Sequence, residues 1–265
     1  MHLSFSPTQK LATSVILTLM LLLAKGNALA ANVAILCYHR FGPTVADSMT
    51  TRTSVFEQQL ARLKQDGYTF VPLATAVDGL RGAAKLPSKP VVLTVDDGHR
   101  TVYSDLLPII RREHLPVTLF IYPSAISNAD YAMTWEQIKE VMAEPGVDVQ
   151  SHTYWHPNFK TEKKRLPANE YQKLVSVQLD KSKVTLKKKL GVDTPFLAWP
   201  FGIYDEELEK AASAAGYRAA LSLGDRTATE RDSLLALPRY LIVDASGINS
   251  MSNMLRDGEL KAEKK

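Results

Sequence analysis

The chain of 265 residues has one cysteine and no low-complexity block. The single thiol, Cys37, excludes an intramolecular disulfide, so the fold must depend on a hydrophobic core. Hydrophobic residues make up 45% of the chain and charged residues 23%, which is typical of an ordinary globular protein. We therefore expect one domain with a sizeable core and a buried position for Cys37 on a strand.

Excess charge of one sign is also lacking. The formal net charge is +4, and two of the positive charges, Lys10 and Lys25, lie within the first 30 residues. The remainder carries too little positive charge to predict nucleic acid as a partner.

Long apolar runs are scarce, and the exception is Leu11 to Leu23. Lys10 precedes this run and Ala28-Leu29-Ala30 follows it, which predicts a cleavable export signal over residues 1–30. A membrane anchor is the less favoured alternative, because thirteen residues are too few to span a bilayer comfortably. We expect residues 31–265 to form one secreted or periplasmic domain with no stable membrane insertion.

Short strand-like runs alternate with segments of helical period. Strands are predicted near residues 33–38, 68–73, 91–95, 117–122, 147–150, 196–199, 219–222 and 237–243. Helices are predicted from Ser54 to before Gly67, near 75–80, 101–114, 134–143 and 204–215, and over a Lys-rich stretch ending before Gly191. Capping boxes are expected at Ser54 and Thr134. This alternation predicts an α/β fold, a distorted TIM-like (β/α) barrel with seven or eight parallel strands. An open doubly wound sheet is the alternative, but no Gly-rich phosphate loop follows the first strand.

Two adjacent carboxylates, Asp96 and Asp97, follow the apolar run from Val91 to Val95. Desolvation and mutual repulsion oppose such a pair at the edge of a core unless a cation or hydrogen bonds intervene. A surface turn is the other interpretation, since Asp-Asp-Gly is ordinary turn chemistry.

Two imidazoles, those of His152 and His156, follow another predicted strand. If this segment coils through one turn, both rings lie on one side within reach of a single ion. Two histidines and one aspartate make a facial set that leaves positions open for water and substrate. The joint pattern favours a metal site over two solvated histidines and a turn.

These motifs resemble those of the polysaccharide deacetylase family, the carbohydrate esterases of family 4 with a NodB-type domain. Thr94-Val95-Asp96-Asp97-Gly98 is similar to the usual Thr-Phe-Asp-Asp-Gly, and His152-Thr153-Tyr154-Trp155-His156-Pro157 to His-Ser/Thr-x-x-His-Pro. The resemblance implies a metal-dependent hydrolase that removes acetyl groups from a polysaccharide. It assigns Asp96 as the general base and, as ligands of a divalent metal ion, Asp97, His152 and His156. Zinc is the expected ion, and cobalt or nickel suits the same donors.

The chain departs from the family pattern in two places. Trp199 stands where the third motif usually carries an arginine, and no histidine follows His156. The stretch Tyr38-His39-Arg40-Phe41 is similar to Tyr-His-x-Phe of the poly-N-acetylglucosamine deacetylase branch, whose motifs are circularly permuted. That resemblance implies His39 as the general acid. Arg239 is a candidate for the missing arginine, and a surface arginine on the last strand is an equally open interpretation.

The third motif and the histidine motif also supply candidate sugar contacts, namely Trp199, Pro200, Phe201 and Tyr154, although aromatic residues more often pack in a core. The expected function is removal of N-acetyl groups from a β-linked N-acetylglucosamine polymer. The alternatives are an O-acetyl esterase acting on xylan-like or other acetylated glycans, and an inactive polysaccharide-binding module or scaffold. A glycosidase with an Asp96 and Asp97 pair is disfavoured, because adjacent residues of an extended segment point to opposite sides. The sequence leaves the oligomeric state open.

Overall fold

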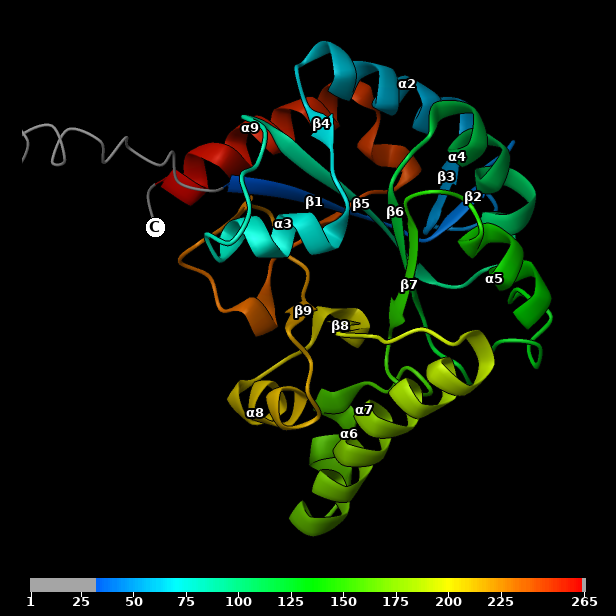
Figure 1. Ribbon diagram of the computed structural model, residues 1–265, viewed down its shortest axis with the longest axis vertical. Coiled ribbons are helices and arrows are strands. Elements are labelled where there is room, and N and C mark those ends of the chain that lie inside the picture. The colour runs from blue at the N-terminus through cyan, green and yellow to red at the C-terminus, as the bar shows by residue number, and fades with distance from the viewer. Residues whose placement is uncertain (1–31, 264–265) are drawn as a thin grey trace, which may run out of the picture. The chain divides into compact units, whose positions relative to one another are not determined.

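The computed structural model describes residues 32–263, and Figure 1 shows their arrangement. The predicted export signal lies outside the described residues. The strands are β1 (Asn32–Tyr38), β2 (Arg40–Gly42), β3 (Thr50–Arg52), β4 (Thr69–Phe70), β5 (Pro90–Asp97), β6 (Val117–Ile121), β7 (Val147–Ser151), β8 (Phe196–Ala198), β9 (Ala219–Leu221), β10 (Ala228–Thr229) and β11 (Tyr240–Leu241). The α-helices are α2 (Thr53–Gln65), α3 (Leu73–Leu80), α4 (Leu107–Glu113), α5 (Trp135–Met142), α6 (Phe159–Arg165), α7 (Ala168–Leu190), α8 (Glu206–Ala214) and α9 (Ile248–Glu263).

Parallel strands form the centre of the fold. Within residues 32–263 the main sheet has the order β10-β1-β5-β6-β7-β8-β9, with β4 paired to β5 and β11 to β1. Every one of these pairs is parallel except β1 with β10. Isolated parallel bridges, Leu221 to Leu237 and Gly224 to Tyr240, connect the end of β9 to β11 and so back to β1. The predicted distorted barrel is confirmed, and its last side is closed only by these short bridges.

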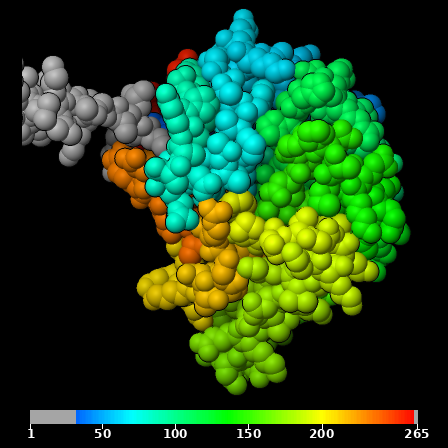
Figure 2. Space-filling view, in the orientation of Figure 1, coloured from blue at the N-terminus to red at the C-terminus, as the bar shows by residue number. Residues whose placement is uncertain are grey.

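Helices cover the outside of this curled sheet. In Figure 1, α9 lies beside α2 at one end, and α6, α7 and α8 gather at the other. Helices α6, α7 and α8 form the lower part of the face shown in Figure 2. Side chains from β1, β5 and β6 pack with α2, α4, α5 and α9 in one core cluster. A second cluster joins β8 and β9 to α7 and α8. Both faces of β5 and β6 are buried, as expected of central parallel strands.

The two predicted capping boxes had different outcomes. The capping box at Thr134 is present at the start of α5. The one expected at Ser54 is wrong, because α2 begins at Thr53 after Arg52 and no side chain caps it. The Lys-rich helix α7 buries Leu179 and Leu186.

Other segments also differ from the prediction, among them the short strands β2, β3 and β10, which were not predicted. The single helix expected over residues 101–114 is a π-helical turn at Val102–Leu106 followed by α4. The last predicted strand shortens to β11, since Pro238 has no amide hydrogen for a ladder. Helix α9 was not predicted at all. Among the described residues, no helix combines the length and apolarity needed to cross a membrane.

Candidate functional site

The carboxyl end of β5 carries both aspartates. Asp96 is buried at 2% exposure, whereas the Asp97 side chain is 18% exposed. The backbone turns there through left-handed conformations at Asp97 (φ 76°) and Gly98 (φ 74°). A Cβ on Gly98 would lie 3.0 Å from Ile121, so a glycine suits this turn. The pair is therefore not an ordinary surface turn.

The two histidines follow the end of β7. The segment does not coil into a helical turn, and left-handed residues at Thr153 (φ 65°) and His156 (φ 62°) fold it instead. The imidazole rings lie 4.5 Å apart between centroids. Nδ1 of His152 lies 2.8 Å from the carbonyl oxygen of Ala198, which leaves Nε2 directed at the aspartates.

Asp97, His152 and His156 offer donors that all lie within 4.8 Å of one another. Oδ1 of Asp97 is 3.7 Å from Nε2 of His152 and 3.8 Å from Nε2 of His156. An ion about 2.0 to 2.2 Å from each donor spaces them by about 3.0 to 3.6 Å, so shifts of a few tenths of an ångström would bring Asp97 to that spacing from each histidine. These residues fit a divalent cation.

Charge also favours a cation at this place. Burial lowers the pKa of His152 to about 3 and lowers that of His156, so both rings are neutral and their lone pairs are free at neutral pH. Burial and the negative charge of Asp96 raise the pKa of Asp97, against the opposing charges of His39 and Arg40. A bound cation would relieve the cost of ionising this carboxyl.

Arg239 lies in the interior, 1% exposed, and not on the surface. Its guanidinium donates to both oxygens of Asp96, with Nη1 to Oδ1 at 2.7 Å and Nη2 to Oδ2 at 2.8 Å. It also donates to Oγ1 of Thr94 at 3.1 Å and, through Nε, to the carbonyl of Ser222. Burial alone would raise the pKa of Asp96, but the charge of Arg239, aided by His152 and His39, holds it well below its usual value. The interpretation of Arg239 as a surface residue is wrong.

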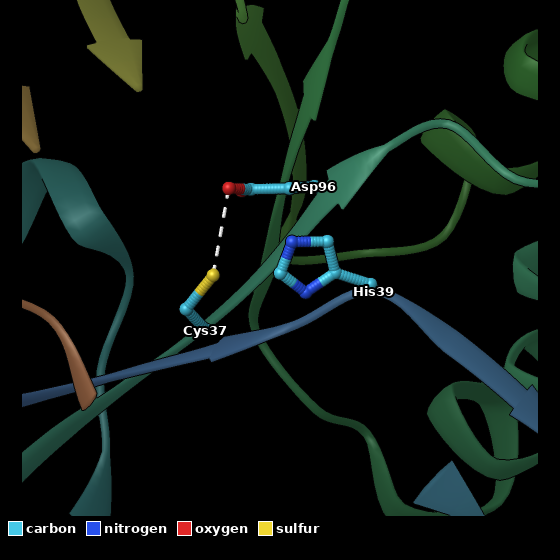
Figure 3. Close-up of side chains that lie close together, drawn as sticks. All are labelled: Cys37, His39 and Asp96. Carbon is cyan, nitrogen blue, oxygen red and sulfur yellow. Dashed lines mark hydrogen bonds between the residues drawn. The ribbon is translucent and has the colours of Figure 1, made fainter. Parts of the chain in front are cut away.

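His39 follows β1 and lies beside Asp96, as Figure 3 shows. Its Nδ1 is buried and has no hydrogen-bond partner. Together with Asp96 and the three metal-site residues it lines a cavity of about 180 Å³. The other lining residues are Met49, Trp199, Phe201, Gly202, Leu223, Arg239 and Leu241. The barrel thus brings the first strand and the last one to the same place.

The predicted sugar contacts divide into two groups. Trp199 is 0% exposed, its ring packs edge-on against Phe159, and its Nε1 donates to the carbonyl of Leu235. Trp199 also belongs to the lining of the cavity, so its contact with a sugar stays a prediction, although its burial leaves little of the ring to stack on. Pro200 is also buried.

Phe201 and Tyr154 differ from these two. Phe201 is 56% exposed, at the rim of the cavity, and its ring lies 4.7 Å from that of His156. Tyr154 is half-buried under the ammonium group of Lys181, 4.0 Å from the ring centroid, and lies outside the cavity lining. Phe201 is thus the most exposed of the four predicted sugar contacts.

The sequence analysis gave no role in the site to two residues that lie there, Tyr122 and Cys37. Tyr122 follows β6, and its ring lies 5.3 Å from that of His156. Its position directly after a central strand could have identified it from the sequence, because polar groups at the carboxyl ends of barrel strands converge on one site. Cys37 contacts Asp96, a tertiary contact for which the sequence carries no signal.

Comparison with known proteins agrees with this geometry. The sequence profile described as polysaccharide deacetylase matches residues 83–220. A poly-β-1,6-N-acetyl-D-glucosamine N-deacetylase of Escherichia coli K12 is 27% identical over 260 residues, which cover 82% of this chain but 38% of the relative. The chain thus spans less than half the length of that relative.

Solved structures share the fold. IcaB from Ammonifex degensii has a TM-score of 0.74 and 27% identity, covering 84% of this chain and 97% of that one. The Streptococcus pyogenes deacetylase PplD, in complex with acetate, has a TM-score of 0.75 over 85% of this chain and 99% of that one, and at 22% identity it supports the fold alone. On the match over residues 83–220, the chain belongs to the polysaccharide deacetylase family.

Proposed function

We propose that the chain hydrolyses N-acetyl groups of a β-linked N-acetylglucosamine polymer, with Asp97, His152 and His156 holding a divalent cation, zinc first among the candidates. The observation that supports this best is the single cavity in which these donors meet the Asp96 and Arg239 pair and His39. The name of the Escherichia coli relative supports the choice of polymer.

A divalent cation at these donors would polarise the acetyl carbonyl and make a water molecule more acidic. Asp96 accepts a proton from the attacking water, and Arg239 fixes the plane of its carboxylate through two hydrogen bonds. His39 donates a proton to the sugar nitrogen, because an amide nitrogen leaves poorly until it is protonated. Phe201 provides an exposed apolar surface for a sugar ring.

Release of acetate from defined oligomers tests the substrate. Oligomers of β-1,6-linked N-acetylglucosamine, chitin oligomers and acetylated xylan are compared, with zinc, cobalt or nickel added after chelation. We expect acetate from the first of these and its loss with a chelator. Preference for acetylated xylan would favour the O-acetyl esterase instead. Binding without acetate from any substrate would favour an inactive binding module.

His39→Ala tests the acid. We expect kcat to fall by about 100-fold or more, within the usual range for general acid catalysis, while metal content stays unchanged. The matched control is His114→Asn, at an exposed histidine that ends α4 in a left-handed conformation that asparagine also accepts. Equal rates for His39→Ala and wild type would contradict the assignment.

We also propose that residues 1–30 direct export and are then removed. Expression of the full chain followed by sequencing of the mature N-terminus tests this. A mature chain that still begins at Met1 would contradict it.

A further inference from the structure

Cys37 is a buried thiol that the proposed mechanism does not use. It is 0% exposed, on β1. Its Sγ lies 3.4 Å from Oδ2 of Asp96 in a hydrogen bond, which Figure 3 draws. Cys37 pairs in register with Thr94 on the adjacent strand β5. The regular pairing of two central strands therefore sets this contact, and no loop is involved.

The carboxylate of Asp96 receives donors from two separate elements. Arg239, just before β11, supplies one hydrogen bond to each oxygen. Two parallel bonds from one guanidinium fix the plane of a carboxylate, yet carboxylate and guanidinium can still shift together. The thiol of Cys37 approaches Oδ2 from β1 and so limits that shared shift. Thr94 steadies the arginine by accepting from Nη1 at 3.1 Å.

A neutral thiol suits this place better than a metal-bound thiolate. Donor atoms of Cys37, His39 and Asp96 lie within 4.8 Å of one another, so a second metal ion bound by these three residues is the alternative to a hydrogen bond. Both oxygens of Asp96 already accept from the Arg239 cation, and a metal ion would add a further positive charge beside it. Burial raises the pKa of the Cys37 thiol, and although Arg239 opposes this, Asp96 adds to it. The thiol therefore keeps its proton as a donor.

We propose that Cys37 is a positioning residue, whose thiol donates to Oδ2 of Asp96 and holds that carboxylate in the orientation in which it accepts a proton. The inference rests on the base role of Asp96 in the proposed function. Because an S–H group is a weak donor, the effect is moderate: loss of the bond lowers kcat by roughly 3- to 10-fold. KM changes by less than about twofold, since the thiol is buried behind the carboxylate.

Three variants separate positioning from packing. Cys37→Val fills the space without a donor, Cys37→Ser keeps a donor in a slightly smaller side chain, and Cys37→Ala removes both. Positioning predicts a kcat order of wild type, Ser, then Val and Ala together. Packing alone predicts the opposite order for Val and Ser, because a valine suits an apolar site better than a hydroxyl. Ile35→Val, two residues earlier on the same face of β1, is the control and should keep the wild-type kcat.

A spectroscopic measurement tests the bond itself. The chain has one cysteine, so its S–H stretching band in the infrared is unambiguous. We expect this band at lower wavenumber in wild type than in Asp96→Ala, where the acceptor is gone. Metal content should be equal in wild type and Cys37→Ala.

The outcomes are distinguishable. Three results would each overturn the inference while leaving the proposed function intact. They are an active wild type whose Cys37→Val variant keeps full kcat, an S–H band at the same wavenumber in wild type and Asp96→Ala, and the loss of one bound metal ion in Cys37→Ala. A wild type that releases no acetate from any of the tested substrates overturns the proposed function and the inference together.

Discussion

Replacing Arg239 by methionine should destabilise the protein strongly. The arginine and the carboxylate it holds are 1% and 3% exposed at their side chains, and their oxygen to nitrogen distances are 2.7 and 2.8 Å. Removing one partner of such a pair leaves an uncompensated buried charge, which costs about 3 to 5 kcal/mol. Arg239→Met should therefore lose about that much free energy of unfolding.

A second substitution should recover part of this loss. In Asp96→Asn with Arg239→Met the buried charge is absent, and the remaining cost is that of an imperfectly bonded amide, about 1 to 3 kcal/mol. The double variant should thus be more stable than Arg239→Met alone. Urea unfolding of the metal-free proteins, followed by circular dichroism, measures all three free energies.

The pH dependence should change sign as well. In wild type the pKa of Asp96 lies below its unfolded value of about 3.9, so its stabilising contribution is present above that pH and is lost as pH falls through the folded pKa. Without Arg239, burial raises the pKa of Asp96, so stability is lost as pH rises instead. Relative to wild type, Arg239→Met should therefore gain stability as the pH falls from neutral toward the unfolded pKa of about 3.9. Equal stability of Arg239→Met and wild type, or a double variant no more stable than Arg239→Met, would refute this reasoning.

Three further changes probe the cavity. Phe201→Ala should raise KM by about 3- to 10-fold, because it removes the apolar surface proposed for a sugar ring. The value of kcat should be retained, since loss of an exposed ring leaves no cavity in the core, and an unchanged KM would exclude Phe201 as a sugar contact. Trp199→Ala should cost about 3 to 5 kcal/mol in urea unfolding, since the indole is fully buried, and a cost below 1 kcal/mol would contradict that burial. Asp97→Ala should weaken zinc binding at least tenfold in chelator competition, with His114→Asn as the control; unchanged affinity would place the ion elsewhere.

The two motifs illustrate how much of the site the sequence predicts. Asp96, Asp97 and His152 lie at or just beyond strand ends, and those strands are recognisable because their apolar runs are local. The carboxyl ends of parallel strands share one end of a barrel, so their convergence follows from the fold class. The backbone conformation that orients the histidine side chains does not follow from the fold class, since the left-handed conformations of Thr153 and His156 depend on what surrounds the loop.

Arg239 and Trp199 mark the limit of that prediction. Both stand in short motifs, and the sequence alone left Arg239 open between surface and site and offered Trp199 as a candidate sugar contact. The structure buries both, because closure of the barrel brings residues 237–241 against β1 and packs the β8 end against α7 and α8.

The sequence by itself determined the strand and helix alternation, the barrel class and the residues of the two family motifs, since each of these depends on neighbours within a few residues along the chain. Only the tertiary structure decided that Arg239 and Cys37 both reach Asp96. Those contacts join residues 143 and 59 positions apart, and their existence depends on how the sheet curls and closes.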